Sequence, residues 1–137
     1  MNSYKISDLT IGHTEYFHVT ITEYMMNKFI EISGDTNPLH SDKIFASQYG
    51  YHDKVVFGML VSSFYSKLIG VYLPGKYALL TNINIEFLKT VFVNDQLKIT
   101  GEITDIDNRF NFINIKSYII RKETKVSKAN IRVTFNE

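Results

Sequence analysis

The stretch GMLVSSFYSKLIGVYL, residues 58–73, decides how the rest of the chain must be arranged. It predicts a long helix that stops at Pro74 and Gly75, since proline cannot continue a helix and glycine favours a turn. Apolar residues surround this helix almost completely, so it must be buried on most sides. The flanking sequence therefore has to supply the elements that cover it.

Beyond Lys76 the apolar residues change from a helical to an alternating period, which predicts strands with one dry and one wet face. Residues 110–120 predict a further strand with a break in phase near Ile113, as at a β-bulge. Asn94-Asp95 and Asp107-Asn108 supply turns. The three alternating segments carry apolar side chains at Leu79, Ile83, Ile85 and Phe87, at Leu97, Ile99 and Ile103, and at Ala129, Ile131, Val133 and Phe135.

The part of the chain before residue 58 is mainly helical by its pattern. Residues 17–21 predict a short strand, and residues 22–33 predict a helix that Thr22 can cap. Ser41 can cap a second short helix that continues to residue 49, with Asp42 complementing the dipole of its first turn.

These elements predict an α+β fold in one domain over residues 1–137, with no repeat or linker to divide it. The order is helices first and an antiparallel meander afterwards. Such a sheet has one apolar face that needs a cover, and the helix over residues 58–73 is the candidate for it. A curled antiparallel sheet wrapped around one buried helix follows from the pattern alone.

Composition excludes several classes of function. The chain has no cysteine, which rules out disulfides, thiolate zinc sites and a cysteine nucleophile. The net charge is +1, from 15 basic and 14 acidic residues, so there is no electrostatic footprint for nucleic acid. Arg121, Lys122 and Lys125 form the one local basic cluster, which we interpret as a solvated hairpin turn rather than a phosphate site.

The sequence predicts neither a membrane span nor a metal site. The most apolar stretch, residues 55–73, is interrupted by three serines and Lys67. Residues 1–10 have no apolar core of signal-peptide length, so we expect a cytoplasmic protein. His13, His18 and His52 have no carboxylate or histidine at ligand spacing, and we expect no metal.

Residues 35–40, Asp-Thr-Asn-Pro-Leu-His, place an acid, an amide, a rigid proline and a histidine in one loop. Pro38 fixes its own φ and pushes Asn37 toward an extended conformation. Asp35 can accept a proton, and His40 can donate or accept one near neutral pH, so the pair can hold one water molecule. By spacing alone, a structural role is favoured, in which Asp35 ends a turn and His40 lies near a helix start.

The wider stretch adds a second line of argument. Phe29-x-x-x-Ser33-Gly34-Asp35-x-Asn37-Pro38-Leu39-His40, followed by Gly58-Met59-Leu60, closely resembles the MaoC-like family of (R)-specific enoyl-CoA hydratases and dehydratases. The resemblance is strong over residues 22–75 and extends over the strands in pattern only. It implies a hot-dog fold, in which a curled antiparallel sheet wraps around a long central helix.

The resemblance also implies roles for single residues. Asp35 and His40 would be the catalytic pair, and Asn37 would orient their loop. The backbone N–H of Gly58 would contact the thioester oxygen, and Ser66 would belong to the hydrogen-bond network of the active site.

Phe57 is a departure from the family pattern. Many relatives have His-Gly-Met where this chain has Phe57-Gly58-Met59. The departure leaves the catalytic pair intact and implies a pocket of different shape and polarity beside the thioester. It therefore bears on substrate choice.

The implied reaction is the reversible addition of water to a trans-2-enoyl-CoA, giving a 3-hydroxyacyl-CoA. No metal or cofactor is expected beyond coenzyme A or an acyl carrier protein as part of the substrate. Since relatives pair their sheets side by side and open strand edges favour pairing, we expect a homodimer or a dimer of dimers.

Three alternatives remain open. The first is dehydration of a 3-hydroxyacyl carrier protein in lipid, polyketide or surface-sugar synthesis, which uses the same residues. The second is a thioesterase, whose acid would more naturally lie on the central helix, although residues 58–73 contain no Asp or Glu. The third is a non-catalytic acyl-thioester-binding module, which would have no need of a base beside the reacting carbon.

Overall fold

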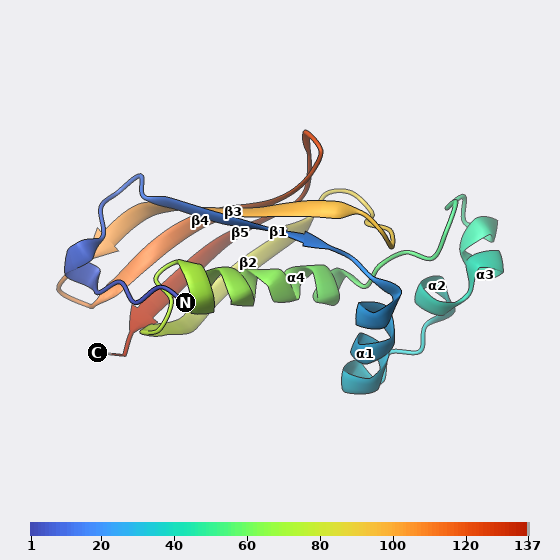
Figure 1. Ribbon diagram of the computed structural model, residues 1–137, viewed down its shortest axis with the longest axis horizontal. Helices are drawn as coiled ribbons and strands as arrows, with labels where there is room; N and C mark the ends of the chain where they lie inside the picture. Colours follow the sequence, from blue (N-terminus) through green and yellow to red (C-terminus); the bar gives the residue numbers. More distant parts are fainter. Residues whose placement is uncertain (137) are drawn as a thin grey trace.

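A computed structural model describes residues 1–136, and five antiparallel strands form its one sheet, in the order β1-β3-β4-β5-β2. Figure 1 shows α4 lying along one face of the curled sheet, while α1, α2 and α3 project beyond one end. This is the α+β hot-dog arrangement that the sequence predicted, and β1 and β2 remain as open edges. The elements are η1 (Ile6–Asp8), β1 (Thr14–Thr20), α1 (Glu23–Ser33), α2 (Pro38–Ser41), α3 (Lys43–Gln48), α4 (Gly58–Lys67), η2 (Leu68–Tyr72), β2 (Ala78–Phe87), β3 (Gln96–Asp107), β4 (Phe112–Arg121) and β5 (Thr124–Phe135).

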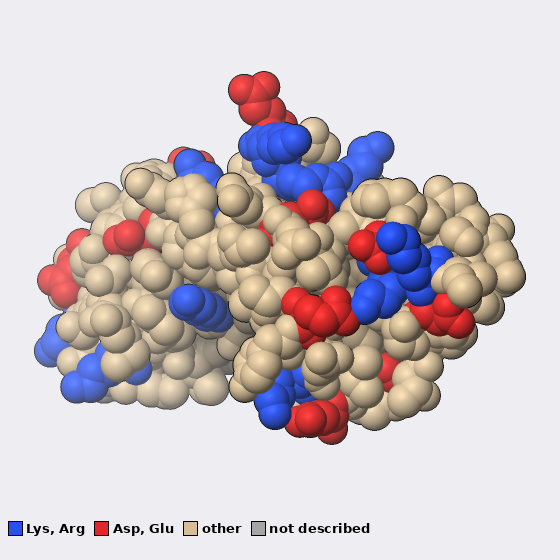
Figure 2. Space-filling model, turned by 45° about the vertical axis from the view of Figure 1, so that its right-hand side comes forward, with Lys and Arg blue, Asp and Glu red and all other residues tan. Residues whose placement is uncertain are grey.

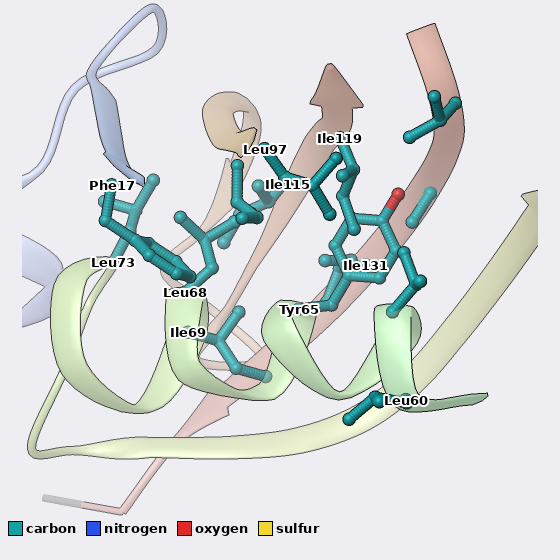
Figure 3. Packing of buried hydrophobic residues seen from close by; sticks show 14 of the residues in the cluster. Phe17, Leu60, Tyr65, Leu68, Ile69, Leu73, Leu97, Ile115, Ile119 and Ile131 are labelled. Atoms are coloured by element: carbon teal, nitrogen blue, oxygen red, sulfur yellow. The ribbon is translucent and has the colours of Figure 1, made fainter. Parts of the chain in front are cut away.

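The core lies between the central helix and the concave face of the sheet. Tyr65 and Leu68 are fully buried, and Figure 3 shows them directed toward sheet residues such as Ile115. The predicted helix over residues 58–73 is confirmed in position, but its last part, η2, is a π-helical segment. Burial of apolar area at about 25 cal/mol per Å² makes this interface the main source of stability.

Gly101 of β3 lets the central helix approach the sheet closely. A Cβ at this position would lie 2.8 Å from Cδ2 of Leu68 and 3.2 Å from Cγ2 of Ile115. Both side chains are buried in the core, so a larger residue here would force them or the helix to shift.

A polar pair is enclosed in this core. The hydroxyl of Tyr65 donates to Oγ of Ser127 at 2.8 Å, and Ser127 Oγ donates to the carbonyl oxygen of Glu86 at 2.9 Å. Both side chains are fully buried, and burial raises the pKa of Tyr65 to about 12. The pair therefore ties the central helix to β5 and β2 through satisfied hydrogen bonds.

Replacing Tyr65 with Phe should lower the free energy of unfolding by about 1 kcal/mol near pH 8, since one buried hydrogen bond is lost. An unfolded tyrosine loses its proton near pH 10.0, whereas the folded one keeps it to about pH 12. The contribution of Tyr65 is thus complete below pH 10 and is lost as the pH rises toward 12. Urea unfolding of both proteins at pH 8 and pH 11 should show the difference shrinking, and a constant difference would contradict this account.

The caps of the first two predicted helices differ in their outcome. Thr22 caps α1 as predicted, with Oγ1 accepting the amide of Met25 at 3.2 Å. The prediction for Ser41 is wrong, because the second helix is two pieces. Asn37 caps α2, and Oδ1 of Asp42 accepts two amides at the start of α3. Asp42 is extended, with φ −125°, and its carboxylate is the better acceptor at this break.

Three strand predictions need correction. The first strand covers Thr14–Thr20 instead of residues 17–21. Strand β4 alternates regularly from Ile113 onward. The bulges lie in the two neighbouring strands. The bulge in β3 faces residues 114–115 of β4, and the bulge in β5 faces residues 119–120 of β4. Leu79 and Phe87 are exposed instead of half-buried, because β2 is an edge strand and its register with β5 shifts between Leu80 and Asn82.

The predicted turns are present at residues 93–94, 108–111 and 122–123. The basic cluster is only partly a solvated turn, because Arg121 lies in β4, is half-buried and pairs with Asp95. Residues 122–123 form the β4–β5 turn, and the left-handed φ of 54° lies at Lys122. Across residues 1–136, every helix is too short or too polar to cross a membrane.

Candidate active site

The loop between α1 and α2 is held by a relay of side-chain to backbone hydrogen bonds. Oγ of Ser33 donates to the carbonyl oxygen of Phe29 at 2.7 Å and accepts the amide of Asp35 at 3.1 Å. Oδ1 of Asp35 accepts the amide of Asn37 at 3.0 Å, and Oδ1 of Asn37 accepts the amide of Leu39 at 2.9 Å. Each polar side chain fixes the backbone two residues further on, so the loop is ordered by its own sequence.

His40 lies at the end of this relay, in α2. Its Nδ1 is 2.7 Å from the carbonyl oxygen of Val55, which can only accept, so we assign the proton to Nδ1. The ring packs on Phe57, with 4.1 Å between ring centres, and Phe57 packs in turn on Phe29 at 4.8 Å. In the neutral ring this leaves Nε2 with a lone pair, and no group within residues 1–136 bonds to it.

A pocket of about 300 Å³ opens beside His40. His40 and Gly58 both line it, together with apolar side chains of two loops, one helix and two strands. Its composition, apolar with a few polar groups, is typical of a site for a small apolar ligand. The remaining lining residues are Val55, Val56, Val61, Phe87, Leu88, Lys89, Thr90, Val91 and Val126.

Gly58 begins the central helix at the wall of this pocket. Phe57 precedes it and offers no side-chain cap, and within residues 1–136 the N–H of Gly58 has no hydrogen-bond acceptor. The positive end of the helix dipole and a free donor therefore lie at the pocket. A Cβ on Gly58 would lie 3.0 Å from the ring of Phe87.

The structure brings together some of the predicted site residues but not all. His40 and Gly58 share the pocket, whereas Asp35 and Asn37 are exposed in the neighbouring loop and do not line it. Ser66 is exposed on α4, eight residues beyond Gly58, and also lies outside the pocket lining. The roles of Asp35, Asn37 and Ser66 therefore stay predictions.

Phe57 lies in a different place from the one expected. Its side chain is 1% exposed, behind the ring of His40, and it does not line the pocket. Any effect of Phe57 on substrate choice must therefore pass through the position of His40.

Two contributors to the pocket were not predicted. The carbonyl of Val55, which fixes the His40 tautomer, is a backbone group and leaves no trace in a sequence pattern. Phe87 was assigned to the buried face of its strand, and its position at the end of an edge strand could have been found only from the strand order. Among the described residues, no three His, Cys, Asp or Glu side chains converge to hold a metal ion.

A sheet curled around one helix defines a hot-dog protein, and its pocket carries a histidine and a helix amide without an acceptor among residues 1–136. The model of the MaoC-like domain matches residues 10–127, and the chain belongs to the MaoC-like family.

Curated relatives include two proteins named (R)-specific enoyl-CoA hydratase. The chain is 38% identical to that of Aeromonas caviae over 76 residues, which cover 56% of this chain and 57% of the relative. It is 27% identical to that of Rhodospirillum rubrum over 110 residues, covering 80% and 76%. A mitochondrial 3-hydroxyacyl-[acyl-carrier-protein] dehydratase of Arabidopsis thaliana is 35% identical over 69 residues, covering 50% and 40%.

Solved structures agree in fold. An (R)-hydratase from A. caviae superimposes with a TM-score of 0.87 at 26% identity, over 92% of this chain and 96% of that one. The R-hydratase PhaJ1 from Pseudomonas aeruginosa gives a TM-score of 0.90 at 22% identity, over 97% and 86%. The second likeness concerns the fold alone.

Proposed function

We propose that this protein is an (R)-specific hydratase/dehydratase that reversibly adds water to a trans-2-enoyl-CoA. The observation that carries the proposal is the placement of His40 and Gly58 on one apolar pocket, with Nε2 of the first and N–H of the second both free of partners within residues 1–136. Names of relatives support the same reaction class.

In this mechanism the Gly58 N–H donates to the thioester carbonyl oxygen at the positive end of α4. That bond strengthens as enolate charge develops on the oxygen, which lowers the barrier for attack at C3. His40 Nε2 accepts a hydrogen bond from the attacking water, and Asp35 takes a proton from that water. The hydroxyl joins C3, and the Asp35–His40 pair supplies the proton that C2 gains, so a water molecule is added in full.

No metal, flavin or nucleotide cofactor takes part in this scheme. The thioester itself acidifies C2, and the helix end polarises the carbonyl. Coenzyme A enters only as part of the substrate. The cytoplasmic location expected from the sequence stays a prediction.

The second candidate is dehydration of a 3-hydroxyacyl carrier protein, which the named plant relatives favour. The residues and chemistry are the same in both cases, and only the carrier and the direction differ. The experiment is to incubate the purified protein with crotonyl-CoA and longer 2-enoyl-CoAs and to follow the enone absorbance. Loss of absorbance with formation of (R)-3-hydroxyacyl-CoA supports the hydratase. Free thiol indicates a thioesterase, and turnover of carrier-protein substrates alone indicates the second candidate.

Assembly as a homodimer is the expected state. Strand β2 is an open edge, and Leu79, Leu80 and Phe87 on it are exposed apolar side chains. Light scattering at micromolar concentration should give twice the 15.9 kDa of one chain, or four times for a dimer of dimers. Leu80→Lys should shift the protein toward monomer, whereas Asn130→Lys in β5, an inner strand of the sheet, should not. A monomeric wild-type protein would refute the prediction.

Phe57→His should change the preference between acyl chains of different length. An imidazole between Phe29 and His40 would bring a polar ring into an aromatic stack and displace His40 relative to the pocket. We expect the ratio of kcat/KM for crotonyl-CoA and 2-octenoyl-CoA to shift by about 10-fold, equivalent to ~1.4 kcal/mol. Phe57→Leu is the control that keeps the site apolar, and an unchanged ratio in Phe57→His would remove Phe57 from substrate choice.

A further inference from the structure

A second and larger cavity lies beside the segment of residues 88–98, whose first residues line the pocket at His40. Its volume is about 660 Å³, and it is formed by β1, β3, the β2–β3 loop, the β4–β5 hairpin and the loop around residue 52. Basic and imidazole side chains from four separate parts of the chain line it: His18, His52, Lys98, Arg121 and Lys122. Arg121 and Lys122 of the basic cluster therefore lie near His18, His52 and Lys98, which are distant from them in sequence.

The charges in this cavity do not cancel. Of the described residues that line it, Asp95 is the only one with a carboxylate, and Oδ2 of Asp95 accepts from Arg121 at 2.7 Å and from the amide of Phe92 at 2.9 Å. Arg121 therefore neutralises Asp95, and the ammonium groups of Lys98 and Lys122 are left as excess positive charge. Figure 2 shows Lys and Arg gathered below the protruding hairpin tip.

Aromatic rings give the cavity flat apolar walls. The rings of His52 and Phe92 both line it and pack on each other, with 4.1 Å between centres. The ammonium of Lys98 lies 4.6 Å from the centre of the Tyr16 ring, which is outside the cavity lining. A cation held over an aromatic ring is restricted in position and keeps its charge for a ligand. The cavity can accordingly receive an anion that carries a flat or apolar group.

One short segment connects this cavity to the pocket at His40. Residues 88–91 line the pocket, and residues 92 and 94–98 line the cavity. Arg121 also donates to the carbonyl oxygen of Thr90 at 2.7 Å, so a side chain of the cavity fixes a wall of the pocket. A ligand that extends around this segment can occupy both.

We propose that the cavity binds the phosphate end of the substrate's carrier arm, with Lys98 and Lys122 as its cationic contacts. The inference rests on the proposed function, which places a pantetheine thioester in the pocket at His40. Lysine binds phosphate as a point charge and needs no planar geometry. The phosphate is either that of coenzyme A or the phosphodiester of an acyl carrier protein.

The test uses two thioesters with the same acyl group, crotonyl-CoA and crotonyl-pantetheine, the second of which has no phosphate. The double variant Lys98→Ala/Lys122→Ala should raise KM for crotonyl-CoA by about 10-fold, because two surface charges facing a phosphate are lost. Its KM for crotonyl-pantetheine and its kcat for both should match the wild type. Lys116→Ala/Lys128→Ala, with the same charge change at another cavity, is the control and should leave every constant unchanged.

Crotonyl-carrier protein distinguishes the two sources of the phosphate. A rise in KM for this substrate without a rise for crotonyl-CoA supports the proposal with the carrier protein as the source. Equal KM values for wild type and double variant with both phosphorylated substrates overturn it, and so does an equal rise with crotonyl-pantetheine.

Direct binding separates this proposal from the proposed function. Calorimetry should show adenosine 3′,5′-bisphosphate binding to the wild type and to the Lys116→Ala/Lys128→Ala control, at least about 10-fold more tightly than to the double variant. A wild type that turns over none of the thioesters refutes the hydratase, whatever the calorimetry shows. Where coenzyme A is the source of the phosphate, equal binding of adenosine 3′,5′-bisphosphate by the wild type, the control and the double variant refutes the phosphate site. That result leaves the proposed hydratase function untouched.

Discussion

Asp35→Asn is expected to lower kcat by about 10²–10⁴-fold, the usual contribution of a general base, while leaving the fold intact. The substitution is nearly isosteric, and an asparagine oxygen can still accept the amide of Asn37 that Asp35 Oδ1 now holds at 3.0 Å. The turn therefore survives, and only proton transfer is lost. KM should change much less than kcat, because the carrier arm is bound elsewhere.

His40→Gln should lower kcat by a similar factor, and the double variant should lose little more than the worse single variant. Residues that serve one step act as a unit and are strongly non-additive. Asp42→Asn is a matched control, since Asp42 is an exposed aspartate whose Oδ1 accepts the amides of Ile44 and Phe45 at a helix start. It should alter the melting temperature slightly and spare turnover.

A purely structural role for the pair makes the opposite forecast. Asp35 does make a turn hydrogen bond, and His40 does lie in a helix start, so both observations fit that role as well. In that case Asp35→Asn and His40→Gln would resemble Asp42→Asn, with a lower melting temperature and normal kcat. Retained activity in a folded Asp35→Asn protein would end the hydratase hypothesis as stated.

Gly58→Val is expected to abolish measurable turnover, a loss of at least about 10²–10³-fold if one oxyanion donor becomes inaccessible. The new Cβ would lie 3.0 Å from the ring of Phe87, which is 55% exposed and can move aside. The fold should therefore persist, with an unchanged circular dichroism spectrum. A folded variant with the kcat of the wild type would place the oxyanion site elsewhere.

A second variant identifies which contact causes the loss. In Gly58→Val/Phe87→Ala the ring that the valine displaces is gone. If the valine side chain itself blocks the thioester, the double variant stays inactive. Recovery of turnover would mean instead that the displaced Phe87 ring fills the pocket, and Phe87→Ala alone serves as the reference.

Much of the fold could be predicted from the sequence because the strongest patterns are local. The alternation in residues 97–103 and 129–135 and the apolar surround of residues 58–73 each reflect one element meeting the core. The predictions that were wrong depend on which strands are neighbours in the sheet. Leu79 and Phe87 follow the same alternation, but β2 is an edge strand with a register shift between Leu80 and Asn82, and both side chains are exposed.

The candidate site could be predicted in part for the same reason. The hydrogen bonds from Ser33 to Leu39 each span two residues, and Ser, Asp and Asn are the residue types that form such turns. The contact between His40 and Val55 joins residues 15 apart through a backbone oxygen, and the stack of Phe57 between Phe29 and His40 depends on packing. Neither leaves a mark in a pattern of side-chain types.

The strand order β1-β3-β4-β5-β2 also has a consequence for how the molecule forms. Strands β3, β4 and β5 are joined by tight turns, whereas β1 and β2 must each find a partner far along the chain. Closing such loops costs more entropy, so we expect the three-stranded hairpin unit to be the folding nucleus. Pulse-labelled hydrogen exchange should then protect amides of β4 before those of α1 and α2. The loop of Asp35 and His40 would be completed last, so substitutions there should accelerate unfolding and leave the folding rate nearly unchanged.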